Sequence, residues 1–334
     1  FPATSAGHFL VGIENRFSYL TRQSIGVGAL FTPLNNPLAN VAWKVFPALL
    51  CGNTVVLKAH EDTPYVPVWF GKLLKEAGIP AGVYSVIQGK GAEVGELLLI
   101  DKRIKFVSFT GSLATGQKIL HATADRLVKV AIEAGGKNPF VVCDDADLEK
   151  ASQLAVMSAF VDAGQRCASA SRIIVFDSVY DEFKNLFLER VRNMKIGVSD
   201  SDDMGAVVNE RRMNEILKAI DEGKQRGGSI ISGGIRLLDK DHKDGFFIAP
   251  TVIENVPKDD NLSLQELFGP VTVLYRVKDF DEAVNLSNMS EYKLSGAIHT
   301  QNIAKAQQFI RKYKAGVVRV NGPTHGSEAH MPFG

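Results

Sequence analysis

A cysteine and a glutamate that stand 34 residues apart are the side chains best suited to chemistry. Cys167 lies in Gly-Gln-Arg-Cys-Ala-Ser and Glu133 in Glu-Ala-Gly-Gly-Lys, so small residues beside each leave room for other groups. A thiolate can attack a carbonyl carbon, and a carboxylate can activate the water that later releases the product. A single cysteine near polar residues is usually only a small buried side chain, so neither segment is decisive alone.

Four more motifs accompany this pair. They are Pro-Leu-Asn-Asn-Pro at 33–37, Phe-Thr-Gly-Ser at 109–112, Glu-Leu-Phe-Gly-Pro at 266–270 and Pro-Phe-Gly at 332–334. In order and in spacing the set resembles the aldehyde dehydrogenase superfamily, over nearly every residue of the chain. The resemblance implies NAD(P)-dependent oxidation of an aldehyde to a carboxylic acid, through a cysteine thiohemiacetal and a thioester that water hydrolyses.

The resemblance also assigns the catalytic roles. Cys167 would be the nucleophile and Glu133 the base that activates water. The tetrahedral oxyanion needs hydrogen-bond donors, and Asn35 matches the family's side-chain donor, with the backbone N–H of Cys167 as the second. Lys44 matches a lysine behind the active site that assists the proton path. Considered alone, Asn35 is an ordinary turn residue between two prolines.

Two residues after a predicted strand point to a nucleotide. Lys58 ends that strand and Glu61 follows it, and ligands bind at the carboxyl ends of strands in open α/β sheets. In the resembled family these positions hold the adenine ribose. The Glu61 carboxylate would repel a 2′-phosphate, which favours NAD, with NADP as the alternative. A solvated salt bridge is the commoner fate of a lone Lys–Glu pair.

Gly111 and Ser112 link a predicted strand to a helix, where small residues let a pyrophosphate approach the helix N-terminus. The usual Gly-x-Gly-x-x-Gly pattern occurs nowhere in the chain, and the resembled family uses this variant instead. Glu266 and Phe268 match family residues that hold the nicotinamide ribose and flank the ring. Without the resemblance, Phe268 is a core residue and Glu266 a surface charge.

Positions that match the substrate tunnel of the family are polar here, which implies a polar substrate because buried polar groups need partners. We expect a short hydroxylated or carboxylate-bearing aldehyde, such as a semialdehyde. For Arg166, a structural partner elsewhere is an equal alternative. The matching positions are Asn36, Asn40, Val161, Arg166 and, in the loop 321–330 that caps the tunnel, His325 and Ser327.

Two other functions stay open. A CoA-acylating semialdehyde dehydrogenase shares the fold, but such enzymes commonly lack the base carboxylate, so Glu133 favours water as the acceptor. A non-catalytic binding or structural member of the fold is the second alternative. The joint presence of Cys167, Glu133 and Asn35 argues against it.

The bulk composition is that of a globular protein. A length of 334 residues suggests two domains, and 45% of the residues are apolar and 22% charged. The net charge of +1 gives no reason to expect nucleic acid or a membrane surface as a partner, and no apolar run reaches the ~20 residues of a spanning helix. Three scattered cysteines are too few for a disulfide framework or a zinc site. We therefore expect no metal and a reducing compartment, the cytoplasm.

Short β-branched runs alternate with amphipathic helices from about residue 53 onward. This alternation predicts an α/β fold with two open, mostly parallel sheets and helices on both faces, and the resemblance implies a variant Rossmann domain followed by a catalytic domain. Strands are predicted at 53–58, 83–87, 105–109, 128–132, 139–143, 172–176, 271–276 and 316–320, and helices at 64–77, 92–100, from about 115, at 147–163, 178–194 and around 213–220.

The expected domain boundaries follow from this order. Residues 1–24 form an extended arm that the resemblance links to oligomerisation, 25–134 a dinucleotide-binding domain that is incomplete on its N-terminal side, and 135–334 a catalytic domain with the nucleophile and the capping loop. Because family members are longer, we expect the chain to lack their N-terminal segment and C-terminal tail. The family also implies a homodimer or homotetramer.

Overall fold

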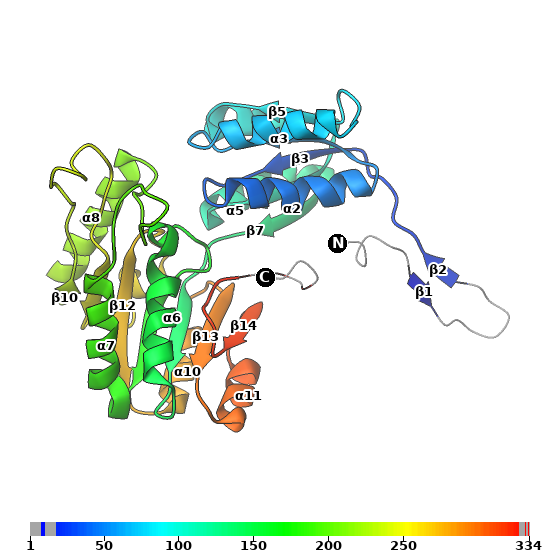
Figure 1. Cartoon of the computed structure of the whole chain (residues 1–334). Coiled ribbons are helices and arrows are strands. Elements are labelled where there is room, and N and C mark those ends of the chain that lie inside the picture. Colours follow the sequence, from blue (N-terminus) through cyan, green and yellow to red (C-terminus); the bar gives the residue numbers. More distant parts are fainter. Residues whose placement is uncertain (1–7, 11–17, 327–330, 332, 334) are drawn as a thin grey trace. The chain divides into compact units, whose positions relative to one another are not determined.

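The computed structural model describes residues 8–10, 18–326, 331 and 333. These residues form two compact units, which are joined between Ala134 and Gly135, and Figure 1 labels their elements. Each unit contains one mostly parallel sheet with helices, so the predicted α/β class with two such sheets is confirmed. A separate antiparallel pair joins β1 (His8–Leu10) to β2 (Ser18–Leu20). Within the described residues, no helix is long and apolar enough to cross a membrane.

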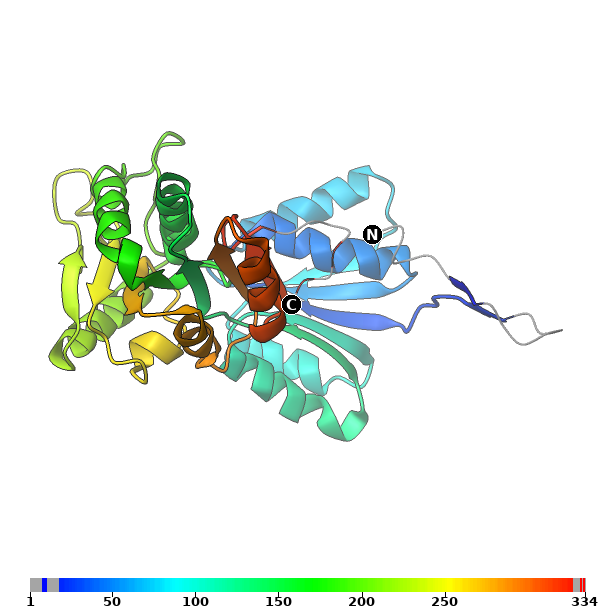
Figure 2. The same ribbon diagram turned by 90° about the horizontal axis from the view of Figure 1, so that it is seen from below.

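The first unit has a five-stranded sheet in which every strand pair is parallel. The strand order is β5-β4-β3-β6-β7, so the direction of chain progress reverses between β3 and β6. Helices α2 and α3 cover one face, and α4 and α5 cover the other (Figure 2). The bounds are β3 Val27–Phe31, α2 Pro37–Leu50, β4 Thr54–Lys58, α3 Tyr65–Glu76, β5 Tyr84–Ile87, a π-helical turn Gly91–Gly95, α4 Glu96–Ile100, β6 Ile104–Thr110, α5 Leu113–Thr123, a 3₁₀ turn Ala124–Arg126 and β7 Lys129–Glu133.

Alternation of side chains along β3 explains why both faces are covered. Leu30 belongs to the apolar cluster beneath α2 and α3, whereas Ala29 and Phe31 belong to the cluster beneath α4 and α5. Successive side chains of a strand point to opposite faces, so a strand that is apolar on both sides needs two helical layers. Gly28 lets the Phe106 ring lie across the strand, because a Cβ at Gly28 would stand 2.1 Å from that ring.

The second unit has a seven-stranded sheet in the order β10-β11-β12-β9-β8-β13-β14, in which only β10 pairs antiparallel. Helices α6 and α7 lie on one face, and α8 and α10 on the other (Figure 2). The bounds are β8 Asn138–Val142, α6 Leu148–Phe160, a 3₁₀ turn Val161–Gly164, β9 Ala170–Phe176, a 3₁₀ turn Asp177–Val179, α7 Tyr180–Arg192, α8 Glu210–Gln225, β10 Ser229–Ser232, β11 Thr251–Glu254, α9 Asn261–Leu264, β12 Val271–Val277, α10 Phe280–Asn288, β13 Ser295–His299, α11 Ile303–Lys312 and β14 Val317–Val320.

The predicted elements agree with this structure to within a few residues, with one clear difference. The helix predicted at 147–163 ends at Phe160, because Asp162 and Ala163 have φ angles of 56° and 53° that no right-handed helix accommodates. The sequence patterns did not reveal several further elements, which are β1, β2, β3, α2, β10, β11, α9 and β13. Gly28 within β3, Pro47 within α2 and Gly296 within β13 obscure the usual signals of a strand or a helix.

Candidate functional site

The strand register of the first unit sets several candidate residues along one edge of the sheet. Phe31 of β3 pairs with Lys58 of β4 and also with Phe109 of β6. Glu133 of β7 pairs with the last residue of β6. The carboxyl ends of four strands are therefore level, and the turn that contains Asn35 follows β3 directly. Ligands bind at this edge of an open α/β sheet, close to the point where the strand order reverses.

Lys58 and Glu61 form an ion pair at the end of β4, with 3.3 Å between Nζ and Oε2. The lysine side chain is 6% exposed and the carboxylate 46%, so the pair has one buried and one open partner. Burial alone would raise the pKa of Glu61. Its own backbone N–H, His60 and Lys58 outweigh burial and hold that pKa below its usual value. Glu61 is therefore an ionised acceptor at neutral pH.

Ser112 is the N-cap of α5, and its hydroxyl accepts a hydrogen bond of 3.3 Å from the backbone N–H of Thr115. Gly111 before it has no space for a side chain, because a Cβ would stand 2.5 Å from the Phe109 ring. The helix N-terminus thus opens at the carboxyl edge of the sheet with its positive dipole end there. This local arrangement fits an anionic group such as a pyrophosphate.

The Asn35 turn is held by a buried side chain of α2. Asn36 takes a left-handed conformation with φ 47°, which Asn tolerates better than most residues. The Asn40 amide Nδ2 donates to the carbonyl oxygens of Asn35 at 3.0 Å and Asn36 at 3.3 Å. Asn40, which the sequence assigned to the tunnel wall, therefore fixes the backbone of the Asn35 turn.

Lys44 and Glu133 form an electrostatic pair inside the first unit. Lys44 Nζ donates a hydrogen bond of 3.0 Å to Ser108 Oγ on β6. Burial lowers the pKa of Lys44 to about 8, and the negative charge of Glu133 opposes part of that shift. A lysine with this pKa exists in both protonation states near neutral pH, so it can hold or release a proton beside Glu133.

In the second unit the candidate residues gather at the amino edge of the sheet. Asn138 of β8 is level with Ala170 of β9, and Cys167 lies three residues before that strand. Glu266 and Phe268 lie just before β12, which runs parallel beside β9. The half-buried thiol and the half-buried Glu266 therefore both stand on loops that enter adjoining central strands.

The loop before Cys167 has an unusual backbone. Asp162, Ala163 and Gly164 have successive φ angles of 56°, 53° and 64°, and such residues outside glycine cost of order 1–3 kcal/mol each. Gly164 is packed against the Glu266-to-Pro270 loop, where a Cβ would stand 2.1 Å from the carbonyl oxygen of Gly269. The nucleophile loop and the loop of Glu266 are thus in direct backbone contact.

Glu266 is itself fixed by the glycines that precede β8. The backbone N–H of Gly136 donates to Glu266 Oε1 at 2.9 Å. A Cβ at Gly135 would stand 2.1 Å from Glu266 Oε2, so only glycine allows this approach. Phe268 follows with a φ of 53°, which turns the chain sharply before β12.

The aldehyde dehydrogenase family matches residues 3–334. The chain belongs to the aldehyde dehydrogenase family.

Individual members of the family are similar along almost the whole chain. The 2,5-dioxopentanoate dehydrogenase of Saccharolobus solfataricus is 40% identical over 95% of this chain, and the alpha-ketoglutaric semialdehyde dehydrogenase of Bacillus subtilis is 37% identical over 96%. This chain spans 66% of the length of each. The crystal structure of betaine aldehyde dehydrogenase from Staphylococcus aureus in complex with NAD+ has a TM-score of 0.94 at 36% identity, over 98% of this chain and 66% of that one.

Arg166 forms an ion pair with Asp162 through its Nε. The pair closes the left-handed turn before Cys167, so the guanidinium has the structural partner that was the alternative to a substrate. Val161 caps the end of α6 and is half-buried. His325 lies near Arg166, and burial, with Arg166 adding to it, lowers the pKa of its imidazole to about 4. Ser327 lies outside the described residues.

Sequence reasoning missed three residues of the second unit, which are Arg172, Lys137 and Asn138. Arg172 is fully buried, and its guanidinium donates to the carbonyl oxygens of Lys137, Leu286 and Ser287. Burial, with Arg172 adding to it, lowers the pKa of Lys137 to about 7, against the opposing charges of Glu266 and Asp260. Asn138 binds the Cys167 backbone. The available signal was an arginine inside the apolar run Ser-Arg-Ile-Ile-Val-Phe.

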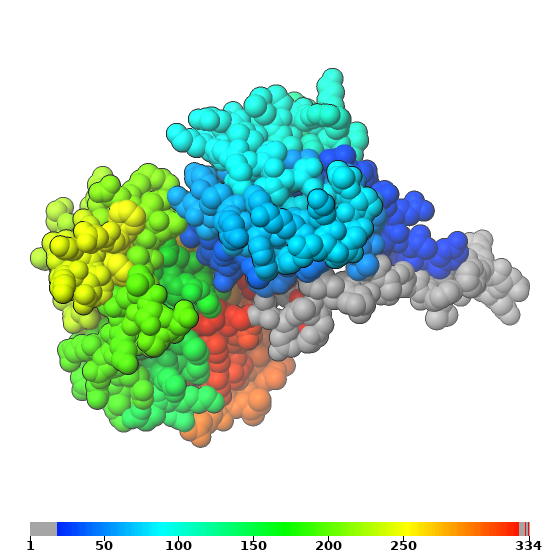
Figure 3. Space-filling model, turned by 45° about the horizontal axis from the view of Figure 1, so that its top comes forward, coloured from blue at the N-terminus to red at the C-terminus, as the bar shows by residue number. Residues whose placement is uncertain are grey.

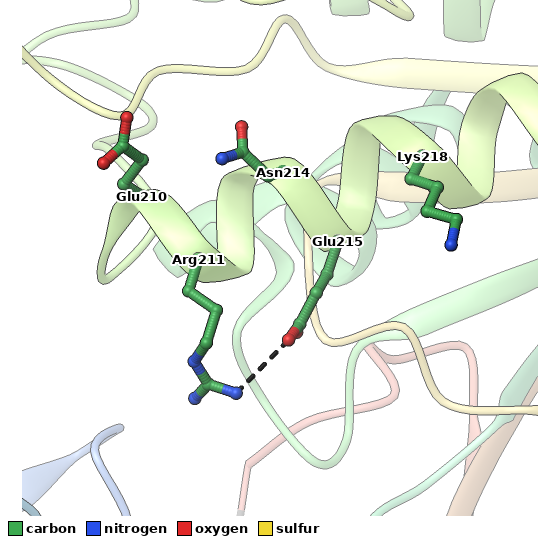
Figure 4. A pocket seen from close by; sticks show the side chains of 5 residues that line it. All are labelled: Glu210, Arg211, Asn214, Glu215 and Lys218. Atoms are coloured by element: carbon green, nitrogen blue, oxygen red, sulfur yellow. Dashed lines mark hydrogen bonds and ion pairs between the residues drawn. The ribbon is translucent and has the colours of Figure 1, made fainter.

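A surface depression on α8 does not belong to this site. Figure 4 shows Glu210, Arg211, Asn214, Glu215 and Lys218 projecting from the one helix, with Arg211 and Glu215 ion-paired at 3.2 Å. The segment from about 200 to 245, lime to yellow in Figure 3, contributes surface on this side, where Ile235 is 60% and Leu238 66% exposed. Among the described side chains, no three His, Cys, Asp or Glu converge as metal ligands.

Proposed function

We propose that the full-length protein oxidises an aldehyde to a carboxylic acid through a thioester on Cys167. The observation that carries this proposal is the half-buried Cys167 on a strained, backbone-anchored turn, in a chain of the aldehyde dehydrogenase family. Such anchoring keeps a nucleophile within the small tolerance that a bond-forming step allows. Because thiols stay reduced in the cytoplasm, we infer that compartment for the protein.

The residues would act in sequence. Cys167 adds to the aldehyde carbon, and the oxyanion accepts hydrogen bonds from Asn35 and from the Cys167 backbone N–H. After hydride loss leaves a thioester, Glu133 takes a proton from water, which attacks the acyl carbon and releases the acid and the thiolate. Lys44, with a pKa of about 8, passes the proton on from Glu133.

The first unit supplies a fitting place for NAD. Lys58 and Glu61 would hold the adenine ribose, and Gly111 and Ser112 would admit the pyrophosphate at the start of α5. Glu266 would hold the nicotinamide ribose, and Phe268 would flank the ring. When bound, NAD+ supplies the hydride acceptor. The ionised Glu61 supports NAD over NADP because it repels a 2′-phosphate.

We further infer a short polar substrate that bears a carboxylate or hydroxyl group. Two similar proteins are named for semialdehyde-type substrates, and we expect Asn36, Arg166 and His325 to supply polar groups to the substrate. As the family resemblance implies, we also infer a homodimer or homotetramer. Sedimentation of the full-length protein tests the assembly, and a monomer at assay concentration contradicts it.

The decisive experiment is rapid mixing of full-length protein with NAD+ and a panel of short aldehydes. We expect a burst of NADH followed by steady turnover. Cys167→Ser should abolish both, because a serine hydroxyl without an activating base is a poor nucleophile. Cys51→Ser is the matched control and should keep both. Glu133→Gln should keep the burst and slow the steady rate.

Three outcomes would redirect the proposal. Absence of NADH with every aldehyde and both cofactors would favour a binding role. Near-native turnover of Cys167→Ser would refute the nucleophile. Turnover that rises with added CoA would identify a CoA-acylating enzyme and remove water as the acceptor.

A further inference from the structure

The buried amide of Asn138 binds backbone groups of the turn that contains Cys167 and of the segment at Ser295. Asn138 is 1% exposed. Its Nδ2 donates to the carbonyl oxygens of Cys167 at 2.7 Å and Ser169 at 2.9 Å, while its Oδ1 accepts from the backbone N–H and the hydroxyl of Ser295, each at 3.1 Å. Two carbonyls on one side and an N–H on the other fix which end of the amide is nitrogen.

The carbonyl oxygens of this turn are held by side chains from two other segments of the chain. The third carbonyl of the turn, that of Ala168, accepts from the Thr324 hydroxyl at 2.6 Å. Asn138 therefore holds two of the three carbonyls between Cys167 and Ser169, and it does so from a neighbouring strand 29 residues away in sequence. Losing it would release the peptide planes that follow Cys167 and Ser169.

Gly136 adapts the chain to this contact. A Cβ at Gly136 would stand 2.1 Å from the Cys167 carbonyl oxygen and 2.7 Å from the Asn138 amide atoms. The same residue gives its N–H to Glu266. The segment before β8 thus approaches the Cys167 backbone as closely as a glycine permits, so that the Asn138 amide can reach it.

We propose that Asn138 is a positioning residue that sets the orientation of Cys167 for attack on the carbonyl carbon. The proposal rests on the function proposed above. By holding the Cys167 carbonyl, Asn138 restricts rotation about the Cα–C bond of Cys167 and so limits where the thiol can stand. A displacement of about 1 Å at a reacting atom can lower a rate about 100-fold.

The test compares Asn138→Ser with Asn53→Ser in the full-length protein. Asn53 is a matched control in the first unit: it is 6% exposed, accepts from the N–H groups of Ile25 and Gly26 and donates to the Ala48 carbonyl. Serine at 138 is too short to reach either the Cys167 carbonyl or the Ser295 groups that Asn138 binds. We expect both variants to lose stability.

The kinetic readouts separate positioning from general destabilisation. In Asn138→Ser the rate constant of the NADH burst should fall about 10- to 100-fold, while the burst amplitude and the Kd for NAD+ stay within about twofold. The rate of iodoacetamide alkylation at Cys167, followed by mass spectrometry with Cys51 as internal reference, should change as well. Asn53→Ser should leave the burst rate and the alkylation rate within about twofold of wild type.

A wild-type burst rate in folded Asn138→Ser would overturn the proposal, as would equal losses in both variants. Should the serine variant not fold, Asn138→Asp replaces it, because aspartate keeps the volume and the acceptor for Ser295 and exchanges the donor facing the Cys167 and Ser169 carbonyls for an acceptor. A native burst rate in that variant overturns the proposal too. If wild-type protein gave no NADH, the proposed function would fail, and the alkylation rates would still report whether Asn138 orients the thiol.

Discussion

Replacing Arg172 by methionine should destabilise the second unit by about 3 kcal/mol. The guanidinium makes four hydrogen bonds, of 2.6 to 3.2 Å, to three buried carbonyl oxygens. Each carbonyl left without a donor costs about 1–3 kcal/mol. Burial lowers the pKa of Arg172 to about 10, so relief of that desolvation returns about 3.4 kcal/mol at 1.36 kcal/mol per pKa unit. At the middle of that range the three carbonyls together cost about 6 kcal/mol. Subtracting the desolvation energy of about 3.4 kcal/mol leaves a net loss of about 3 kcal/mol.

The control is Arg276→Met on the neighbouring strand β12. Arg276 is 44% exposed and pairs with Asp177 and Asp181, each at 2.7 Å, and exposed ion pairs contribute about 0–1 kcal/mol. Urea unfolding of the full-length protein, followed by circular dichroism, measures both variants. The larger loss corresponds to a fall in melting temperature of about 6–12 °C for a unit of this size. If Arg172→Met were as stable as Arg276→Met, the buried guanidinium would not be an anchor, and the reasoning would be refuted.

Three further predictions concern the first unit and the substrate. Glu61→Gln should narrow the preference for NAD over NADP, measured as the ratio of kcat/KM values; a wild-type preference for NADP would show that Glu61 does not face the ribose. Arg166→Ala should raise KM for an anionic semialdehyde more than for a neutral aldehyde of equal length. Asp162→Asn removes the competing carboxylate and should lower KM for the anionic substrate. Equal changes of KM on both substrates would make Arg166 structural. Folding lowers the pKa of Lys44 from 10.5 to about 8. Between these two pH values the folded state therefore binds fewer protons than the unfolded state. The free energy of unfolding should rise with pH over this window by up to about 3.4 kcal/mol. Lys44→Met should lack this rise in urea titrations at the two ends of the window, and an unchanged rise would place the proton elsewhere.

The candidate residues that the sequence revealed can all be identified from their immediate neighbours in the sequence. Glu133 stands beside two glycines, and Cys167 stands in a short polar run before an apolar strand. The alternation of strands and helices after residue 53 was equally local, since hydrophobic periodicity reports burial directly. Where glycine or proline interrupted that periodicity, as at Gly28 and Pro47, the strand β3 and the helix α2 were lost to sequence analysis.

The supporting residues could not be found in this way, because their partners lie far along the chain. Arg172 reaches the Leu286 carbonyl across 114 positions, and Asn138 reaches Cys167 across 29. An arginine inside an apolar strand and an asparagine before a proline each have many local explanations. Only the parallel register of the strands shows which carbonyls stand opposite them.

The sequence by itself therefore determined the family and the α/β class and indicated Cys167 as the candidate nucleophile, because residue type and local spacing carry that information. The tertiary structure decided which strand ends are level, that Asn40 fixes the Asn35 turn, and that Arg166 pairs with Asp162. These depend on hydrogen-bond register and on backbone conformations with positive φ, which arise when distant segments pack against one another. A side chain's neighbours in space, unlike its neighbours in sequence, exist only after that packing.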